Sequence, residues 1–196
     1  MRPTWILAMF SAATLFAAER MNVSVCNQGR LPESLVEKAE AEADLVFRAM
    51  NVEVVWGNCR DEFPGGDVDR GFRFVIRLRD GHPPKTAGLT SLDTMGKALM
   101  TAPGEGYIAD IHYQAVQAFA DRNGTDREGL LGHVIAHEIG HLLLGPGHSP
   151  HGIMSALWRG ADAMALKRRW LKFTIAEEER IHRNLQALNS GQAAPR

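Results

Sequence analysis

The chain has 196 residues, of which 45% are hydrophobic and 23% charged, and this length suffices for one hydrophobic core. Its formal net charge is -1, from 22 basic and 23 acidic residues, so no strong field favours nucleic acid or an anionic membrane as a partner. We therefore expect one domain over residues 19–189, followed by a disordered tail over residues 190–196.

Residues 1–18 have the pattern of a secretory signal peptide. Arg2 gives a positive start, an apolar run covers residues 5–16, and small residues end at Ala18. The run is too short to span a bilayer comfortably, so we expect cleavage near Ala18 and no membrane anchor afterwards. The protein would then be secreted or periplasmic. The alternative, a start at Met21, would give a cytosolic protein with reduced cysteines.

The next segments predict a strand, a helix and a second strand. The strands are Met21–Cys26 and Val52–Trp56, and the helix between them, Glu33–Met50, has apolar residues at three- and four-residue steps. A crossover of this kind makes the strands parallel and places Cys26 and Cys59 at the same end of the sheet. The two cysteines can form one disulfide, whose loop would contribute about 3 to 4 kcal/mol to stability.

Three more strand candidates follow an acidic loop, Asp61–Arg70, which lacks the regular ligand spacing of a calcium site. Arg73–Arg79 alternates strictly between two faces, and Thr86–Leu92 and Gly106–His112 are the other two candidates. Tyr113–Ala120 is expected to form a short helix. The sequence therefore predicts an α/β fold with a mixed, twisted sheet of about five strands.

The residues that carry chemistry begin with two histidines four positions apart. On a helix, His137 and His141 leave the same face and can both reach one cation, about 2 Å from each nitrogen. Glu138 is rotated by about 100° from His137, which puts it beside the metal, where a carboxylate can take a proton from a metal-activated water. The pattern indicates two zinc ligands and one general base.

A third histidine follows the end of this helix. Gly145 accepts a left-handed C-cap and Pro146 prevents continuation, so the chain must turn back. His148 lies just past the turn and could reach the metal, with His151 as the rival third ligand. Three protein ligands and one open position are typical of catalytic zinc. The sequence therefore predicts catalytic Zn²⁺ bound by the two helical histidines and His148.

The helix that carries these histidines is apolar around most of its circumference, which predicts burial. Thr125 and Glu128 form a capping box, so the helix is expected to run from Asp126 to Leu144. His133 lies one turn before the first ligand. It could support the metal site, but a hydrogen bond elsewhere is the favoured interpretation. Gly140 indicates that another backbone packs closely against the helix.

A final helix is predicted after a second capping box, formed by Thr174 and Glu177. Four apolar residues of this helix are expected to face the core: Ile175, Ile181, Leu185 and Leu188. The segment over residues 158–173 gives no clear pattern.

The candidate zinc-site residues form one longer motif. It reads His137-Glu138-x-x-His141-x-x-x-Gly145-x-x-His148 and is followed by Gly152-Ile153-Met154. This arrangement resembles the metzincin family of zinc endopeptidases. Three residues separate His141 from Gly145, where two are usual in this family, and this spacing resembles that of the archaemetzincins. The archaemetzincins also have downstream cysteines that bind a second zinc, and this sequence lacks them.

The resemblance implies a zincin-like α+β fold with a long backing helix, an active-site helix, a Met-turn and a C-terminal helix. It implies that Met154 packs beneath the metal without binding it. It also implies that Thr86–Leu92 is an antiparallel edge strand above the cleft, to which an extended peptide can add as a further strand.

These observations predict a secreted or periplasmic zinc-dependent endopeptidase that acts on a peptide or protein substrate, with Glu138 as general base. The alternative is a non-proteolytic, zinc-stabilised binding module of the same fold. Glu138 argues against this alternative, because a purely structural site gains nothing from an unliganded carboxylate. A small-peptide or amino-terminal peptidase would share the same chemistry.

Overall fold

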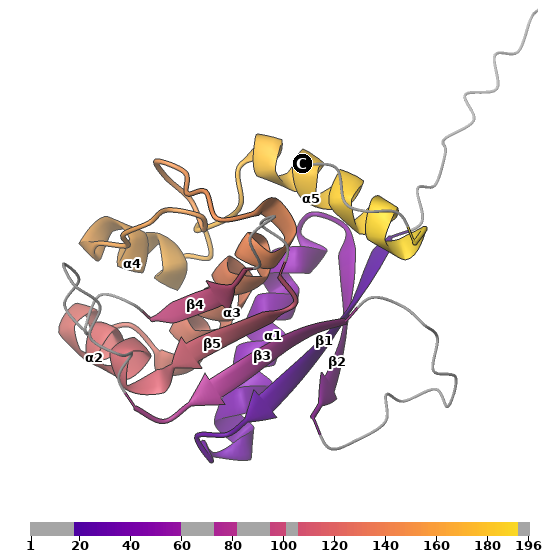
Figure 1. The fold of residues 1–196 in the computed structure, drawn as a ribbon. Coiled ribbons are helices and arrows are strands. Elements are labelled where there is room, and N and C mark those ends of the chain that lie inside the picture. Colours follow the sequence, from indigo (N-terminus) through magenta and orange to yellow (C-terminus); the bar gives the residue numbers. More distant parts are fainter. Residues whose placement is uncertain (1–17, 60–72, 82–94, 101–105, 192–196) are drawn as a thin grey trace, which may run out of the picture.

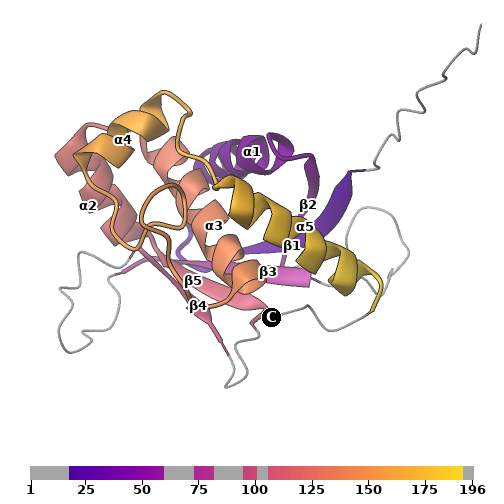
Figure 2. The same cartoon turned by 90° about the horizontal axis from the view of Figure 1, so that it is seen from above.

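The computed structural model describes residues 18–59, 73–81, 95–100 and 106–191. Within them the chain forms a five-stranded sheet with helices packed on one face (Figures 1 and 2). The strands are β1 (Glu19–Asn27), β2 (Val52–Asn58), β3 (Arg73–Arg79), β4 (Gly96–Leu99) and β5 (Ile108–His112). The helices are α1 (Glu33–Arg48), α2 (Tyr113–Asn123), α3 (Arg127–Leu144), α4 (Gly160–Lys167) and α5 (Ile175–Asn189).

The sheet is mixed, as predicted, and its strand order is β2-β1-β3-β5-β4. β1, β2, β3 and β5 are parallel, whereas β4 runs antiparallel to β5 at the edge. This antiparallel edge is Gly96–Leu99, which was not among the predicted strands. The predicted strand Thr86–Leu92 and the acidic loop Asp61–Arg70 lie outside the described residues. Among the residues described, no helix has both the length and the apolar character that crossing a membrane would require.

The active-site helix of the prediction, α3, covers the same face of the sheet as α1 (Figure 2). Side chains of β3 alternate, and Phe74, Ile76 and Leu78 point into the core with 0% exposure. α1 packs beside α3 at very short range. A Cβ added to Gly132 of α3 would lie 2.6 Å from the carbonyl oxygen of Ala39 in α1. These small residues bring the two helices together and fix the position of α3.

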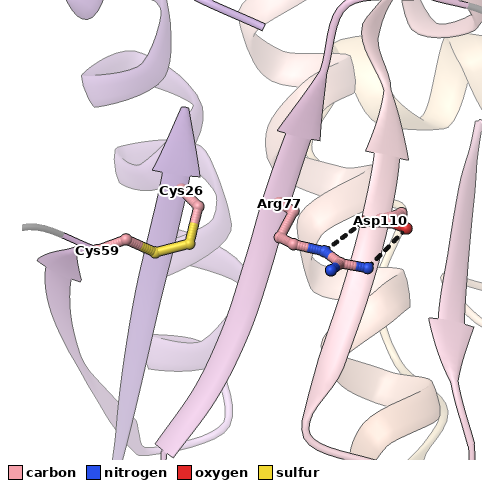
Figure 3. Close-up of a disulfide and its surroundings, with 4 residues drawn as sticks. All are labelled: Cys26, Cys59, Arg77 and Asp110. Carbon is pink, nitrogen blue, oxygen red and sulfur yellow. Dashed lines mark hydrogen bonds and ion pairs between the residues drawn. A yellow bond between two sulfur atoms is a disulfide. The ribbon is translucent and has the colours of Figure 1, made fainter. Parts of the chain in front are cut away.

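The other face of the sheet carries polar and covalent links (Figure 3). The predicted disulfide joins Cys26 of β1 to Cys59, directly after β2, with Cα atoms 5.1 Å apart. On the same face, Arg77 donates two hydrogen bonds to Asp110, of 2.6 and 2.9 Å, and Arg79 donates a third of 3.0 Å. Burial raises the pKa of Asp110, but the bonds from both arginines outweigh it and hold this pKa below its usual range.

Two predicted details at helix ends need correction. The N-cap of α3 is Asp126, whose carboxylate accepts a hydrogen bond from the Gly129 N–H. Thr125 does not cap the helix, because its hydroxyl is buried without a hydrogen-bond partner among the described residues. In α5 the predicted Thr174 cap is present, but Ile175 is 76% exposed because the first turn of the helix projects from the core.

Candidate metal centre

Two imidazoles project from α3 with their orientations set by backbone carbonyls. The Nδ1–H of His137 donates to the Ile153 carbonyl at 2.6 Å, and that of His141 donates to the Gly145 carbonyl at 3.0 Å. A carbonyl can only accept, so Nδ1 carries the proton in each ring. The Nε2 lone pairs of both rings are therefore free to bind a cation.

The turn after α3 brings a third imidazole to the same place. Gly145 adopts φ 92° and ends the helix, and the chain reverses so that Nε2 of His148 lies 3.1 Å from Nε2 of His141. The ligand atoms of His137, His141 and His148 all lie within 4.8 Å of one another. Two nitrogens bound to one tetrahedral zinc would be about 3.3 Å apart, so these residues fit the metal. His151, the rival ligand, is exposed and outside this group.

Burial keeps the helical histidines neutral. The pKa of His137 is lowered to about 4, chiefly by burial and also by the neighbouring imidazoles of His141 and His148, whereas the hydrogen bond to the Ile153 carbonyl opposes this change. Burial also lowers the pKa of His141, with a further decrease caused by His148. Neutral imidazole is the form that coordinates a metal ion.

The predicted Met-turn packs against α3 beneath the site. Met154 is 1% exposed, and a Cβ added to Gly140 would collide with its sulfur atom. The close neighbour at Gly140 is thus a side chain and not the backbone that the sequence suggested. The Ile153 carbonyl, which holds His137, also accepts a hydrogen bond of 3.2 Å from the Trp158 indole. The turn therefore orients the His137 imidazole directly.

The cap of α5 holds the same turn from the other side. Glu177 is buried, and its carboxylate accepts hydrogen bonds from the Ser149 hydroxyl and, at 2.7 Å, from the Thr174 N–H. The capping box was predicted, but the hydrogen bond from Ser149 to Glu177 was not. The signal for this bond was absent because Ser149 and Glu177 are 28 positions apart in the sequence.

The carboxylate beside the histidines is buried, and no described residue gives it a counter-charge. Glu138 is 3% exposed, it accepts a hydrogen bond from the Ala98 N–H of β4, and its Oε2 has no partner among the described residues. Burial raises the pKa of Glu138 to about 8, although the bond from Ala98 lowers it. A Cβ added to Gly96 would collide with this carboxylate. Sequence reasoning missed Gly96 and Ala98 because β4 was not predicted.

His133 is not part of the metal group. It is buried, and its Nδ1 lies 2.8 Å from the Gly129 carbonyl of the preceding turn. The favoured interpretation, a histidine hydrogen-bonded elsewhere, is confirmed. Burial lowers the pKa of His133, so this residue is also neutral.

A cavity of about 620 Å³ opens over the three histidines and Glu138. It is bounded by β4 on one side and by the end of α2 and the loop before α4 on the other. β4 is the last strand of the described sheet, and an edge strand beside a group of metal-binding side chains can hold an extended chain next to the reacting centre.

Two solved structures share this fold. One is the archaemetzincin from Methanopyrus kandleri, with a TM-score of 0.51 and 18% identity over 88% of this chain and 99% of that chain. The other is metalloproteinase-II from Bacteroides fragilis, with a TM-score of 0.52 and 14% identity over 88% of this chain and 54% of that one. The sequence matches no protein-family model and no curated protein. The chain thus has a zincin-like fold, as predicted, and its three clustered histidines are consistent with a zincin-like metallopeptidase.

Proposed function

We propose that this protein is a secreted or periplasmic zinc-dependent endopeptidase. The observation that carries the proposal is the convergence of three imidazoles beside a buried carboxylate, at a strand edge, in a fold shared with metallopeptidases. His137, His141 and His148 would hold the zinc, and Glu138 would act as general base.

Several features of the donor set support zinc in this position. The ligands are nitrogens, two of the rings are oriented through Nδ1, and the spacing of 3.1 Å between two Nε2 atoms suits a tetrahedral ion. When bound, zinc would polarise the scissile carbonyl, lower the pKa of a water molecule and favour the ionised form of Glu138.

Glu138 would carry the proton during hydrolysis. The Ala98 N–H orients its carboxylate, and the unpartnered Oε2 is the atom that would take a proton from the attacking water. The same carboxyl would then give this proton to the leaving amine. Because the side chain is buried, bulk water does not compete for this proton transfer.

The position of β4 at the edge of the sheet that the structure describes supports an extended peptide as substrate. A peptide that adds to β4 would form backbone hydrogen bonds along the cleft and place one of its own carbonyls near the three histidines. Binding through the backbone suits an endopeptidase, because it does not require a chain terminus.

We propose in addition that the protein is exported and that residues 1–18 are its signal peptide. The disulfide between Cys26 and Cys59 supports this, because such bonds persist mainly in oxidising compartments. The apolar run over residues 5–16 is the second support.

Metal content tests the ligand set directly. Zinc measured by elemental analysis after dialysis should be close to one ion per chain in the parent and should be lost in His141→Ala and His148→Ala. His151→Ala is the matched control, since this exposed histidine lies outside the cluster, and it should keep its zinc. Full zinc occupancy in His141→Ala would contradict the ligand assignment.

Peptide cleavage tests the activity. The zinc-loaded parent should cleave an internal bond of a peptide blocked at both ends, with a rate close to that of its free-amine form. A requirement for the free amine would instead indicate an amino-terminal peptidase. Zinc binding without cleavage of any peptide in a diverse library would favour the binding module.

A further inference from the structure

One lobe of the cavity lies between α2, α3 and the segment before α4, and its walls are apolar. It is lined by Phe119, Val134 and Trp158, and all three residues are buried. The indole of Trp158 lies edge-on to the His137 ring, with centroids 5.7 Å apart, so the lobe begins next to the metal site.

The ends of α2 and α4 meet at the mouth of this lobe. The Lys167 ammonium of α4 donates a hydrogen bond of 3.3 Å to the Asn123 carbonyl at the end of α2. A Cβ added to Gly160 would lie 3.9 Å from the Asn123 side-chain oxygen. These contacts bring Arg122, which precedes Asn123, to the same end of the cavity as Arg159, which precedes Gly160.

The charges that line the cavity are mostly positive. Arg122 and Arg159 are exposed lining residues, and neither of them has an ion-pair partner within the described part of the chain. The acidic groups nearest in the sequence already have partners other than these guanidinium groups: Asp121 pairs with Arg127 at 3.0 Å, and Asp162 accepts a hydrogen bond of 2.8 Å from the backbone N–H of Arg159. The whole chain has almost equal numbers of acids and bases, so this excess of cations is local.

The direction of β4 decides which part of a bound peptide meets these arginines. β4 starts at Gly96 beside Glu138, and at its other end Leu99 lies near Leu142, because a Cβ added to Gly106 would touch both. A peptide that pairs antiparallel with β4, the more stable arrangement, runs from Leu142 towards the lobe. Residues that follow the cleaved bond therefore enter the lobe.

We propose that the cleft selects a carboxylate directly after the cleaved bond, an inference that rests on the proposed endopeptidase function. The apolar stem of a Glu side chain would pack between Phe119 and Trp158, and its carboxylate would accept hydrogen bonds from the guanidinium groups of Arg122 and Arg159. Planar guanidinium groups match carboxylates in shape and charge. The free C-terminal carboxylate of a short peptide has the same chemistry and is the second possible source.

A matched set of quenched fluorescent peptides tests the proposal on the zinc-loaded protein. The peptides differ only in the residue after the cleaved bond, which is Glu, Gln or Lys, and each is made with an amidated and a free C-terminus. With amidated peptides, kcat/KM should be about tenfold higher for Glu than for Gln and lowest for Lys. If only peptides with a free C-terminus are cleaved preferentially, the carboxylate that the cleft binds is the C-terminal carboxylate of the substrate and not the Glu side chain.

Charge reversal then ties the preference to the two arginines. Arg122→Glu and Arg159→Glu should each reduce the ratio of kcat/KM for the Glu peptide to that for the Gln peptide to near one or below. Each variant should also cleave the peptide with Lys after the bond faster than the parent does. Arg183→Glu makes the same charge change on α5, away from the cleft, and should leave the ratio and the activity unchanged. Arg122→Gln and Arg159→Gln give a second pair in which no new charge is introduced.

A binding measurement separates selection from turnover. Fluorescence anisotropy with the Glu138→Gln protein should give a Kd about tenfold lower for the Glu peptide than for the Gln peptide, and this difference should vanish in combination with Arg122→Glu. The inference would be overturned by equal Kd and kcat/KM values for the Glu and Gln peptides. It would also be overturned if Arg183→Glu lost the preference for the Glu peptide as fully as the two cleft variants do. Either result would leave the proposed endopeptidase function standing. Absence of all cleavage would instead refute the proposed function.

Discussion

Two carboxylates on opposite sides of the sheet differ in their ion pairing and therefore in their pKa. On the outer face, Asp110 is held by Arg77 and Arg79, and its pKa lies below the usual range. In the cleft, Glu138 has no arginine or lysine partner among the described residues, and burial raises its pKa to about 8.

The difference separates stability from chemistry. A carboxylate paired with two cations is a fixed anion that gains nothing from a proton, so it strengthens the fold. A buried carboxylate without a counter-charge costs free energy, but it can exchange a proton readily when a cation and a water molecule are nearby. Changes in the cleft should therefore reduce activity more than stability, and changes on the outer face should do the reverse.

The largest effect is expected for Glu138→Gln. Loss of the general base should lower kcat about a thousandfold, while zinc content stays at the parental level. The metal-free variant should be at least as stable as the parent, because an amide replaces a buried carboxylate. Parental kcat in this variant would show that Glu138 is not the base.

Removal of the disulfide is the corresponding test on the outer face. Replacing Cys26 and Cys59 together by serine should lower the free energy of unfolding by about 3 to 4 kcal/mol, because the unfolded chain gains entropy. Urea denaturation at fixed zinc concentration measures this. Below the unfolding transition kcat/KM should remain parental, and a large fall would mean that the disulfide shapes the cleft.

Gly96→Ala examines how closely β4 must approach Glu138. The added methyl group would collide with the carboxylate and displace it, so kcat should fall by about ten- to a hundredfold with zinc retained. Gly147→Ala is the matched control, because a Cβ there would meet nothing within 4 Å. Equal kcat values for both variants would show that the approach of β4 does not orient the base.

The smallest effect is expected for Asp110→Asn, which should cost about 1 to 3 kcal/mol of stability near neutral pH and leave kcat unchanged. Because the pKa of Asp110 is lowered in the folded protein, its contribution is complete above its ordinary value of 3.8 and is lost as pH falls through the lowered pKa. The stability difference between parent and variant should therefore shrink below about pH 4. A difference that stays constant on acidification would mean that the ion pairs do not stabilise the fold.

Much of the site was predictable because short periods in the sequence place residues within one rigid element. The helical period alone puts His137 and His141 on one face and Glu138 beside them, and the strict alternation of Arg73–Arg79 identifies β3 and its buried side. The cap of α5 was also readable, since its two partners are three residues apart.

Tertiary structure decided the features that join residues distant in the chain. It places His148 and not His151 beside His141, sets the edge strand at Gly96–Leu99, and brings the end of α2 next to α4. Local propensity carries no information about these contacts, because each depends on how loops close and on which surfaces pack together. For the same reason, the sequence alone gives the positions of His137, Glu138 and His141 along their helix, whereas the burial of the Glu138 carboxylate depends on the approach of β4.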